Sequence, residues 1–239
     1  MAPLRLRDGR TATLATVLPV AWAGLHRADG TVLVAAQTST RSGDLSRDIA
    51  WALLAALDAE PGSPVVGTGT PGEGPRLQDL LEDVPLEVEV RPGFDFWVDG
   101  VDDSSGEIAA SLERANAAVV PTERLGSVEA AYWCRIRESY HLRWVLPIPE
   151  EAFFDAAARL HARQSLDLGE GTRFVGTFRA AGLVVPVWDL AAGTDAAATE
   201  PLARALLGRL DEAVAEKAPL TGDERRARAG LVSRQVTLR

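Results

Sequence analysis

The sequence predicts an α+β fold in which helices pack against a largely antiparallel sheet, and three observations indicate it. Pairs of strand patterns separated by turn residues recur near residues 14–37, 86–98, 130–147 and 173–189. A helix pattern follows each pair. The stretch "FVGTFRAAGLVVPVWDL" from residue 174 also shares its order of aromatic, glycine, Arg-Ala, glycine and β-branched run with "WAGLHRADGTVLVAAQ" from residue 22.

The first two helices follow the first two strand pairs. Ser46 is the predicted N-cap of the first, whose apolar stripe is Ile49, Leu53 and Leu57 and whose end is marked by Pro61. The second carries apolar residues between positions 108 and 119 and is ended by a proline at position 121. Both patterns have the spacing of helices that bury one side.

The other two helices follow the last two strand pairs. Acidic residues after Pro149 favour the positive end of a third helix, which turns apolar residues 153–160 inward. Thr199 is the predicted N-cap of the fourth, with Pro201 in its first turn. Its apolar residues are spaced four apart, at Leu202, Leu206, Leu210 and Val214.

A single strand–strand–helix unit of about 40 residues cannot cover its own apolar faces, so such units share a sheet. We therefore predict a pseudo-two-fold repeat of these units, with one half at residues 1–125 and the other at 126–218. Residues 219–239 form a basic tail. Residues 61–75, "PGSPVVGTGTPGEGP", contain four prolines and five glycines and are interpreted as a flexible surface loop. In the repeat, Gly24 corresponds to Gly176 and Gly30 to Gly182.

Composition narrows the class of protein. A chain of 239 residues is long enough to build a core without a disulfide or a metal. No apolar run reaches the ~18 residues of a membrane span. The start "MAPLRLRDGR" has no apolar region behind its charges, so a cytoplasmic protein is expected. The net charge of -9 opposes binding to nucleic acid and to anionic lipid.

No metal or cofactor is predicted. Cys134 is the only cysteine, and the three histidines are scattered. Glycines at 67, 69 and 72 match a dinucleotide fingerprint, but no strand leads into them and a proline interrupts them, so a flexible loop is favoured. Aspartates at 95, 99, 102 and 103 lack calcium-loop spacing, and a solvated strand end before an acidic helix start accounts for them.

The third strand pair is the main candidate for binding, because alternation separates its two faces. Tyr132, Cys134 and Ile136 are expected to share an apolar face with the residues at 142, 144 and 146. The other face then presents a basic and aromatic surface made of Trp133, Arg135, Arg137, His141 and Arg143. This surface suits phosphates or bases. In the competing interpretation a helix covers the tryptophan, and the arginines pair with carboxylates. Cys134 is interpreted as a core thiol, with the histidine on the opposite face.

The basic tail offers a second set of candidate binding residues, Arg225, Arg226 and Arg228. A capping box from Thr221 to Glu224 begins a short helix there. Docking of this tail on the body of the protein is favoured over a free tail, because its apolar residues need cover. These residues are Leu231, Val232, Val236 and Leu238.

Several stretches together resemble an actinobacterial family whose domain of unknown function covers nearly the whole chain. They are "TLATVLPVAWAGLHRADG", "GPRLQDLL", "GFDFWV", "SLERANAAVVPT", "VEAAYWCRI", "RWVLP" and "RARAGLVSRQVTLR". Members of that family are often labelled translocase-related, and many begin with a lysine-rich arm that this chain does not show. The resemblance implies no activity and no site residue.

We interpret the chain as a non-enzymatic interaction module that engages a protein partner through the arginine-rich strand pair or the basic tail. One alternative is an enzyme with a polar pocket between the two halves, lined by Arg76, Asp79, Glu113 and Asn116. The other is a nucleic-acid-associated protein that uses the third strand pair, which the negative net charge disfavours.

Overall fold

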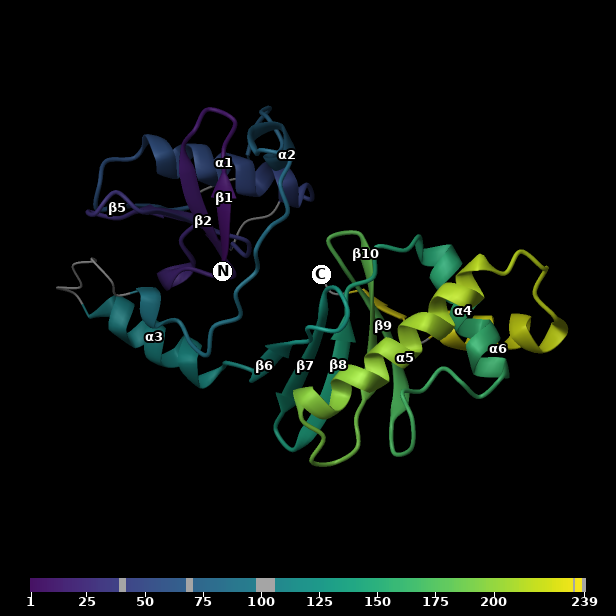
Figure 1. The fold of residues 1–239 in the computed structure, drawn as a ribbon. Coiled ribbons are helices and arrows are strands. Elements are labelled where there is room, and N and C mark those ends of the chain that lie inside the picture. Colours follow the sequence, from purple (N-terminus) through teal and green to yellow (C-terminus); the bar gives the residue numbers. More distant parts are fainter. Residues whose placement is uncertain (39–41, 68–70, 98–105, 234, 238–239) are drawn as a thin grey trace. The chain divides into compact units, whose positions relative to one another are not determined.

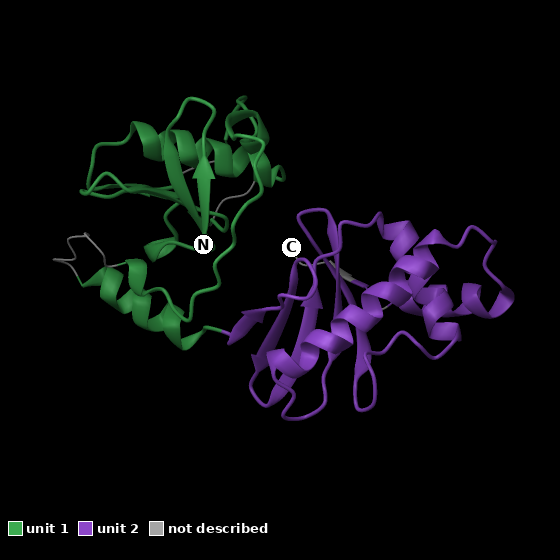
Figure 2. Cartoon of the chain, in the orientation of Figure 1, with its two compact units in different colours: residues 1–119 green, residues 120–239 purple. Residues whose placement is uncertain are grey.

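The computed structural model describes residues 1–38, 42–67, 71–97, 106–233 and 235–237 (Figure 1). The predicted positions Gly69, Asp99, Asp102, Asp103 and Leu238 lie outside these ranges. The chain divides into two compact units, unit 1 at Met1–Val119 and unit 2 at Val120–Arg239 (Figure 2). Each unit combines helices with a mostly antiparallel sheet, so the predicted α+β class is confirmed.

Unit 1 contains a five-stranded sheet in the order β1-β2-β4-β3-β5, in which only β2 and β4 pair in parallel. Its strands are β1 (Ala2–Arg5), β2 (Thr11–Ala15), β3 (Gly24–His26), β4 (Val32–Ala35) and β5 (Ser63–Val65). Its helices are α1 (Leu45–Asp58), α2 (Leu77–Leu80) and α3 (Glu107–Ala117), with 3-10 turns η1 (Pro19–Ala21) and η2 (Asp95–Trp97). Helix α1 packs closely on β3, where a Cβ atom on Gly24 would come within 2.8 Å of the Ala56 Cβ.

Unit 2 contains a six-stranded sheet in the order β11-β9-β10-β8-β7-β6, in which only β11 and β9 pair in parallel. Its strands are β6 (Thr122–Arg124), β7 (Ala131–Ile136), β8 (Ser139–Trp144), β9 (Arg173–Ala180), β10 (Leu183–Asp189) and β11 (Gln235–Thr237). Its helices are α4 (Glu150–Ala162), α5 (Ala196–Ala215) and α6 (Gly222–Val232).

The core of unit 2 lies between one face of this sheet and its helices. The strands contribute the buried residues Trp144 and Trp188 to this core. Helices α4 and α5 contribute Phe153 and Leu206 to the same cluster. Each of these indoles donates a hydrogen bond of 2.9 Å to a backbone carbonyl, so burial leaves no unpaired N–H group. Figure 1 shows α5 running across this side of the sheet.

The helices lie where the sequence predicts them, but two of them begin earlier than expected. Asp44, not Ser46, is the N-cap of α1 and accepts a hydrogen bond from the Arg47 backbone. Asp195 caps α5 one turn before Thr199, so Pro201 lies inside the helix. In both cases a carboxylate upstream of the predicted residue accepts a hydrogen bond from a free backbone N–H group in the first turn of the helix.

The strand prediction is correct for three of the four pairs and wrong for residues 86–97. There the chain forms no strand pair and instead enters the 3-10 turn η2, whose Phe96 and Trp97 are buried. The stretches around β3–β4 and β9–β10 are both hairpins followed by a helix, and Gly30 and Gly182 both have positive φ at their turns. Their superposition as a repeat stays a prediction.

The C-terminal helix and strand pack on unit 2, as expected, although of the apolar residues expected to need cover Val232 is 38 % exposed. Helix α6 lies against α4, and Leu231 is 2 % exposed within the core cluster. Strand β11 extends the sheet beside β9. In the described ranges, no helix combines the length and the hydropathy that crossing a membrane requires.

Candidate functional site

The turn between β7 and β8 determines which side chains share a face of the unit 2 sheet. Ile136 pairs with Ser139, so the turn contains only two residues and every even-numbered position of β7 faces an odd-numbered position of β8. Tyr132 therefore lies opposite Arg143. Residues directly opposite each other project to the same side. The predicted division of the two faces, which paired even positions with even positions, is therefore wrong.

Trp133 belongs to the side of the sheet that the helices cover. It is 7 % exposed, and its indole donates a 2.8 Å hydrogen bond to the Thr194 carbonyl. Arg135 projects from the same side at the strand end, opposite Tyr140, and stays exposed. Arg137 lies in the turn itself, with φ of 56°. Of the five residues expected to form one basic and aromatic surface, the pairing thus places Trp133 on one face and Arg143 and His141 on the other.

The other side of the unit 2 sheet, which we call the open face, carries side chains that lie outside the core cluster shared with α4, α5 and α6, although Cys134 and Val185 on it are buried. Strand pairing arranges its side chains in two rows across the strands. One row is Arg124, Tyr132, Arg143 and Val187. The other row is Thr122, Cys134, His141, Asp189 and Arg173.

The first row of the open face places an aromatic ring between two cations. Tyr132 is half-buried, and its cross-strand neighbours are Arg124 and Arg143. Within the described part of the chain, no ion pair joins either arginine to a carboxylate. Both guanidinium groups are therefore available to an external acceptor.

The charged side chains of the second row contact one another. The Nδ1 atom of His141 lies 3.0 Å from one oxygen of Asp189, and Arg173 donates a 2.7 Å hydrogen bond to the other oxygen. His141 also lies directly opposite Cys134, so its predicted projection to the other face is wrong. The cysteine is 1 % exposed, and burial raises the pKa of its thiol, while the nearby Arg143 acts in the opposite direction. A thiol held protonated in this way is a poor nucleophile.

The arginines of the basic tail make contacts inside unit 2. Arg228 donates to Asp155 at 2.6 Å and also pairs with Glu151, which joins α6 to α4. The hydrogen bond to Asp155 and the two nearby carboxylates raise the pKa of this guanidinium. Arg226 pairs with an aspartate of its own helix, and Arg225 donates to the carbonyl of Leu220. The tail thus uses Arg228 for docking, and its other two arginines are exposed.

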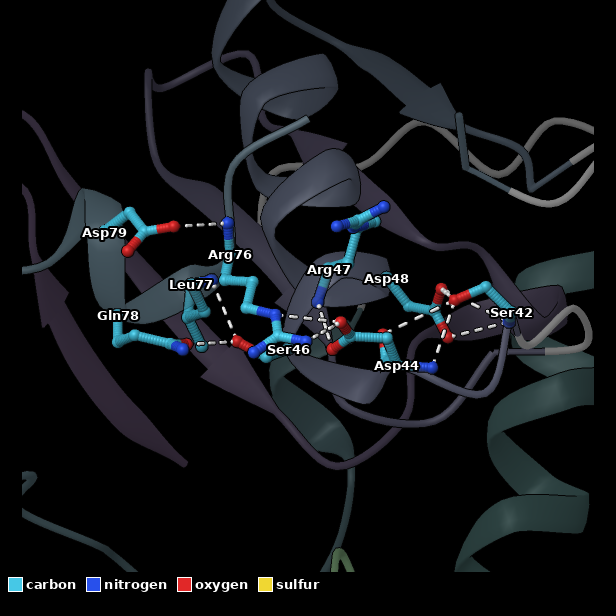
Figure 3. Close-up of polar contacts among 9 residues, drawn as sticks. All are labelled: Ser42, Asp44, Ser46, Arg47, Asp48, Arg76, Leu77, Gln78 and Asp79. Carbon is cyan, nitrogen blue, oxygen red and sulfur yellow. Dashed lines mark hydrogen bonds and ion pairs between the residues drawn. The ribbon is translucent and has the colours of Figure 1, made fainter. Parts of the chain in front are cut away.

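The four residues proposed for an enzyme pocket fall into separate places within unit 1. Arg76 forms a 2.9 Å ion pair with Asp44 at the start of α1, and its backbone N–H donates to Asp79 (Figure 3). Asn116 lies on α3, where its side-chain oxygen accepts a 2.8 Å hydrogen bond from the backbone of Phe94. No contact joins the two groups among the described residues, and no set of three His, Cys, Asp or Glu side chains in those ranges is placed to hold a metal ion.

Sequence reasoning found Arg143 but missed Arg124, Tyr132 and Asp189 as members of one surface. The signal that could have found them is the length of the β7–β8 turn. That turn is Arg137-Glu138 and contains neither glycine nor asparagine, so the sequence marks its centre poorly.

A family model described as "Family of unknown function (DUF5926)" matches residues 1–239. No curated protein and no solved structure matches the chain.

Proposed function

This chain belongs to the DUF5926 family, whose function is unknown, and we propose that it is a non-enzymatic interaction module whose open face binds an acidic segment of a protein partner. The observation that carries the proposal is the row in which Tyr132 lies between Arg124 and Arg143, two arginines with no carboxylate partner in the described ranges. The actinobacterial origin and the translocase label implied by the resemblance stay expectations.

The charge of the open face supports an acidic partner. The face carries Arg124, Arg143 and Arg173 against the single carboxylate of Asp189, whereas the whole chain has a net charge of -9. A positive surface on an acidic molecule attracts negative segments and repels an identical positive surface. The proposal therefore names a different protein as partner and does not invoke self-association through this face.

The side chains around the arginines favour a protein over a nucleic acid. On β10, Val187 is half-buried and Val185 is 1 % exposed, and the half-buried Phe178 lies opposite Val185 on β9. Apolar residues with tyrosine and arginine around them are typical of protein–protein interface centres. Binding to single-stranded nucleic acid depends on several aromatic rings for stacking. With Trp133 buried, Tyr132 is the one tyrosine or tryptophan that the described strands present on this face.

The experiment compares a double variant with a matched control. The variant is Arg124→Glu with Arg143→Glu, and the control is Arg135→Glu with Arg226→Glu, which changes charge equally at exposed positions off the open face. Binding of a fluorescein-labelled peptide of alternating glutamate and leucine is measured by anisotropy on the full chain. We expect binding to weaken about tenfold or more in the double variant, the equivalent of ~1.4 kcal/mol, and to stay unchanged in the control.

A second arm separates the protein partner from nucleic acid. Single-stranded RNA of matched charge is titrated under the same conditions, and added salt should weaken its electrostatic binding steeply. We expect the acidic peptide to bind more tightly than the RNA at every salt concentration. Tighter RNA binding, or equal peptide binding by the double variant and the wild type, would overturn the proposal.

A further inference from the structure

A pocket in unit 1 lies between α1 and the loop at residues 71–75. It encloses about 250 Å³. Helix α1 contributes Arg47, Trp51, Leu54 and Ala55. These positions are spaced four, three and one apart, so they lie on one side of the helix, beside the stripe that faces the sheet. The opposite wall is Pro71, Gly72, Glu73, Gly74 and Pro75.

Arg47 is the cation of this pocket; Asp44 lies close enough for the two charges to interact, but its carboxylate is paired with another arginine. Asp44 is held by two nitrogens of Arg76, each at 2.9 Å from the same carboxylate oxygen. Asp48 accepts hydrogen bonds from the backbone and the hydroxyl of Ser42. Figure 3 shows the Arg47 guanidinium pointing away from Asp44, and no ion pair involving it occurs in the described ranges. Its Nε atom is buried and has no hydrogen-bond partner among the described residues, whereas its terminal nitrogens are not buried in this way.

The terminal nitrogens of this guanidinium group form no ion pair within the described ranges. Two such nitrogens form a fork that matches the two oxygens of a carboxylate. Trp51 supplies an aromatic side chain next to this fork, and Leu54 and Ala55 extend the apolar wall. Such an arrangement suits a molecule with one anionic end and one flat apolar end.

We propose that this pocket binds a small aromatic carboxylate, with its carboxylate on Arg47 and its ring against Trp51. The volume of about 250 Å³ lies just below the range usual for drug-sized ligands, so the ligand is small. Glu73 is the carboxylate in the lining, and it is exposed, so water screens its repulsion of an anion. The pocket is independent of the open face of unit 2.

The test uses three probes of one shape that differ in charge: benzoate, benzamide and benzylamine. The full chain is labelled with ¹⁵N in its tryptophan indoles, and the Trp51 resonance is assigned through Trp51→Phe. We expect benzoate to shift this resonance with an affinity at least about tenfold higher than benzamide, the effect of one charge-assisted bidentate contact. Benzylamine is expected to leave it unchanged.

The variant Arg47→Gln should lower the benzoate affinity to that of benzamide. The matched control is Arg114→Gln, which removes an exposed arginine on α3 outside the pocket lining. The comparison of the three probes on the wild type stands by itself if the Arg47 variant fails to fold. Equal affinities for benzoate and benzamide, preference for benzylamine, or no shift of Trp51 with benzoate would overturn the proposal.

Discussion

Ala181 shows how one residue can carry backbone strain at a turn. It forms the β9–β10 turn together with Gly182, and both have positive φ, at 50° and 82°. Two positive φ values in a two-residue hairpin turn favour Asn-Gly. An alanine in the left-handed region costs about 1–2 kcal/mol, because its Cβ crowds the following carbonyl.

Replacing Ala181 with asparagine should therefore stabilise the protein. The side chain is exposed, so no packing is lost. We expect the free energy of unfolding to rise by about 0.5–1 kcal/mol in urea denaturation. Ala181→Val is the control and should lower it, because a β-branched residue tolerates positive φ poorly. A lower unfolding free energy in the asparagine variant would show that the turn is not strained.

The contact between α5 and the loop at residues 126–127 is made by one carboxylate that accepts hydrogen bonds from the loop backbone. Glu200 accepts hydrogen bonds from the backbone N–H groups of Gly126 and Ser127, at 2.6 and 2.8 Å. Hydrogen bonding from Ser127, and then from Gly126, holds the pKa of this carboxyl below its ordinary value of 4.5. The ionised form is the one that the fold stabilises.

This contact should make stability depend on pH. Because the folded pKa lies below the unfolded one, the stabilisation is present above the ordinary pKa and is lost as the pH falls through the folded value. Glu200→Gln should therefore show a smaller loss of unfolding free energy between about pH 6 and pH 3 than the wild type. Glu212→Gln, at an exposed position of the same helix, is the control and should leave the pH dependence unchanged. Equal pH slopes for the wild type and the Glu200 variant would contradict this.

The edge of the unit 1 sheet shows how one proline limits strand pairing. Residues 82–90 run beside β1 and contact it at two places. The backbone N–H of Glu82 donates to the Arg5 carbonyl at 2.9 Å, and the backbone N–H of Glu89 donates to the Met1 carbonyl at 2.7 Å. Pro3 lies between these positions and has no N–H group to donate. Between the two contacts β1 advances four residues and the facing segment seven, so the two are also out of register. The facing segment forms no strand, and its residues Val84, Leu86, Val88 and Val90 are exposed.

At the scale of the whole molecule, the two units have separate hydrophobic cores. The cluster of buried residues in unit 2 draws only on residues 125–231. The two clusters of unit 1 draw only on residues 4–97. A segment with its own core and sheet has what an independently folding domain needs.

We therefore expect residues 120–239 to fold when expressed alone. Circular dichroism during urea denaturation should show one cooperative transition. A fragment without a cooperative transition would show that unit 2 needs residues 1–119.

Leu206 provides a second measurement on the same units, because it is fully buried in the unit 2 cluster. Leu206→Ala should lower the unfolding free energy by about 2–5 kcal/mol through lost burial and a cavity. The loss should be equal in the fragment and in the full chain. The control is Leu183→Ala, at an exposed position of β10, which should have a much smaller effect. An unchanged denaturation midpoint for the Leu206 variant would contradict its place in the core.

The sequence by itself determined the α+β class and the positions of α1, α3, α4 and α5, and it favoured docking of the tail. These follow from local periodicity and from the amount of apolar side chain that needs cover.

Only the tertiary structure decided which face of the β7–β8 pair the helices cover. Trp133 and Tyr132 are adjacent, and alternation alone makes either one the inner residue. The two-residue turn pairs Tyr132 with Arg143, and burial of Trp133 under the helices then leaves the row with Arg124 on the open face. A shift of one residue in pairing exchanges the faces of one strand relative to its neighbour. Which face is then covered depends on helices far away in the sequence.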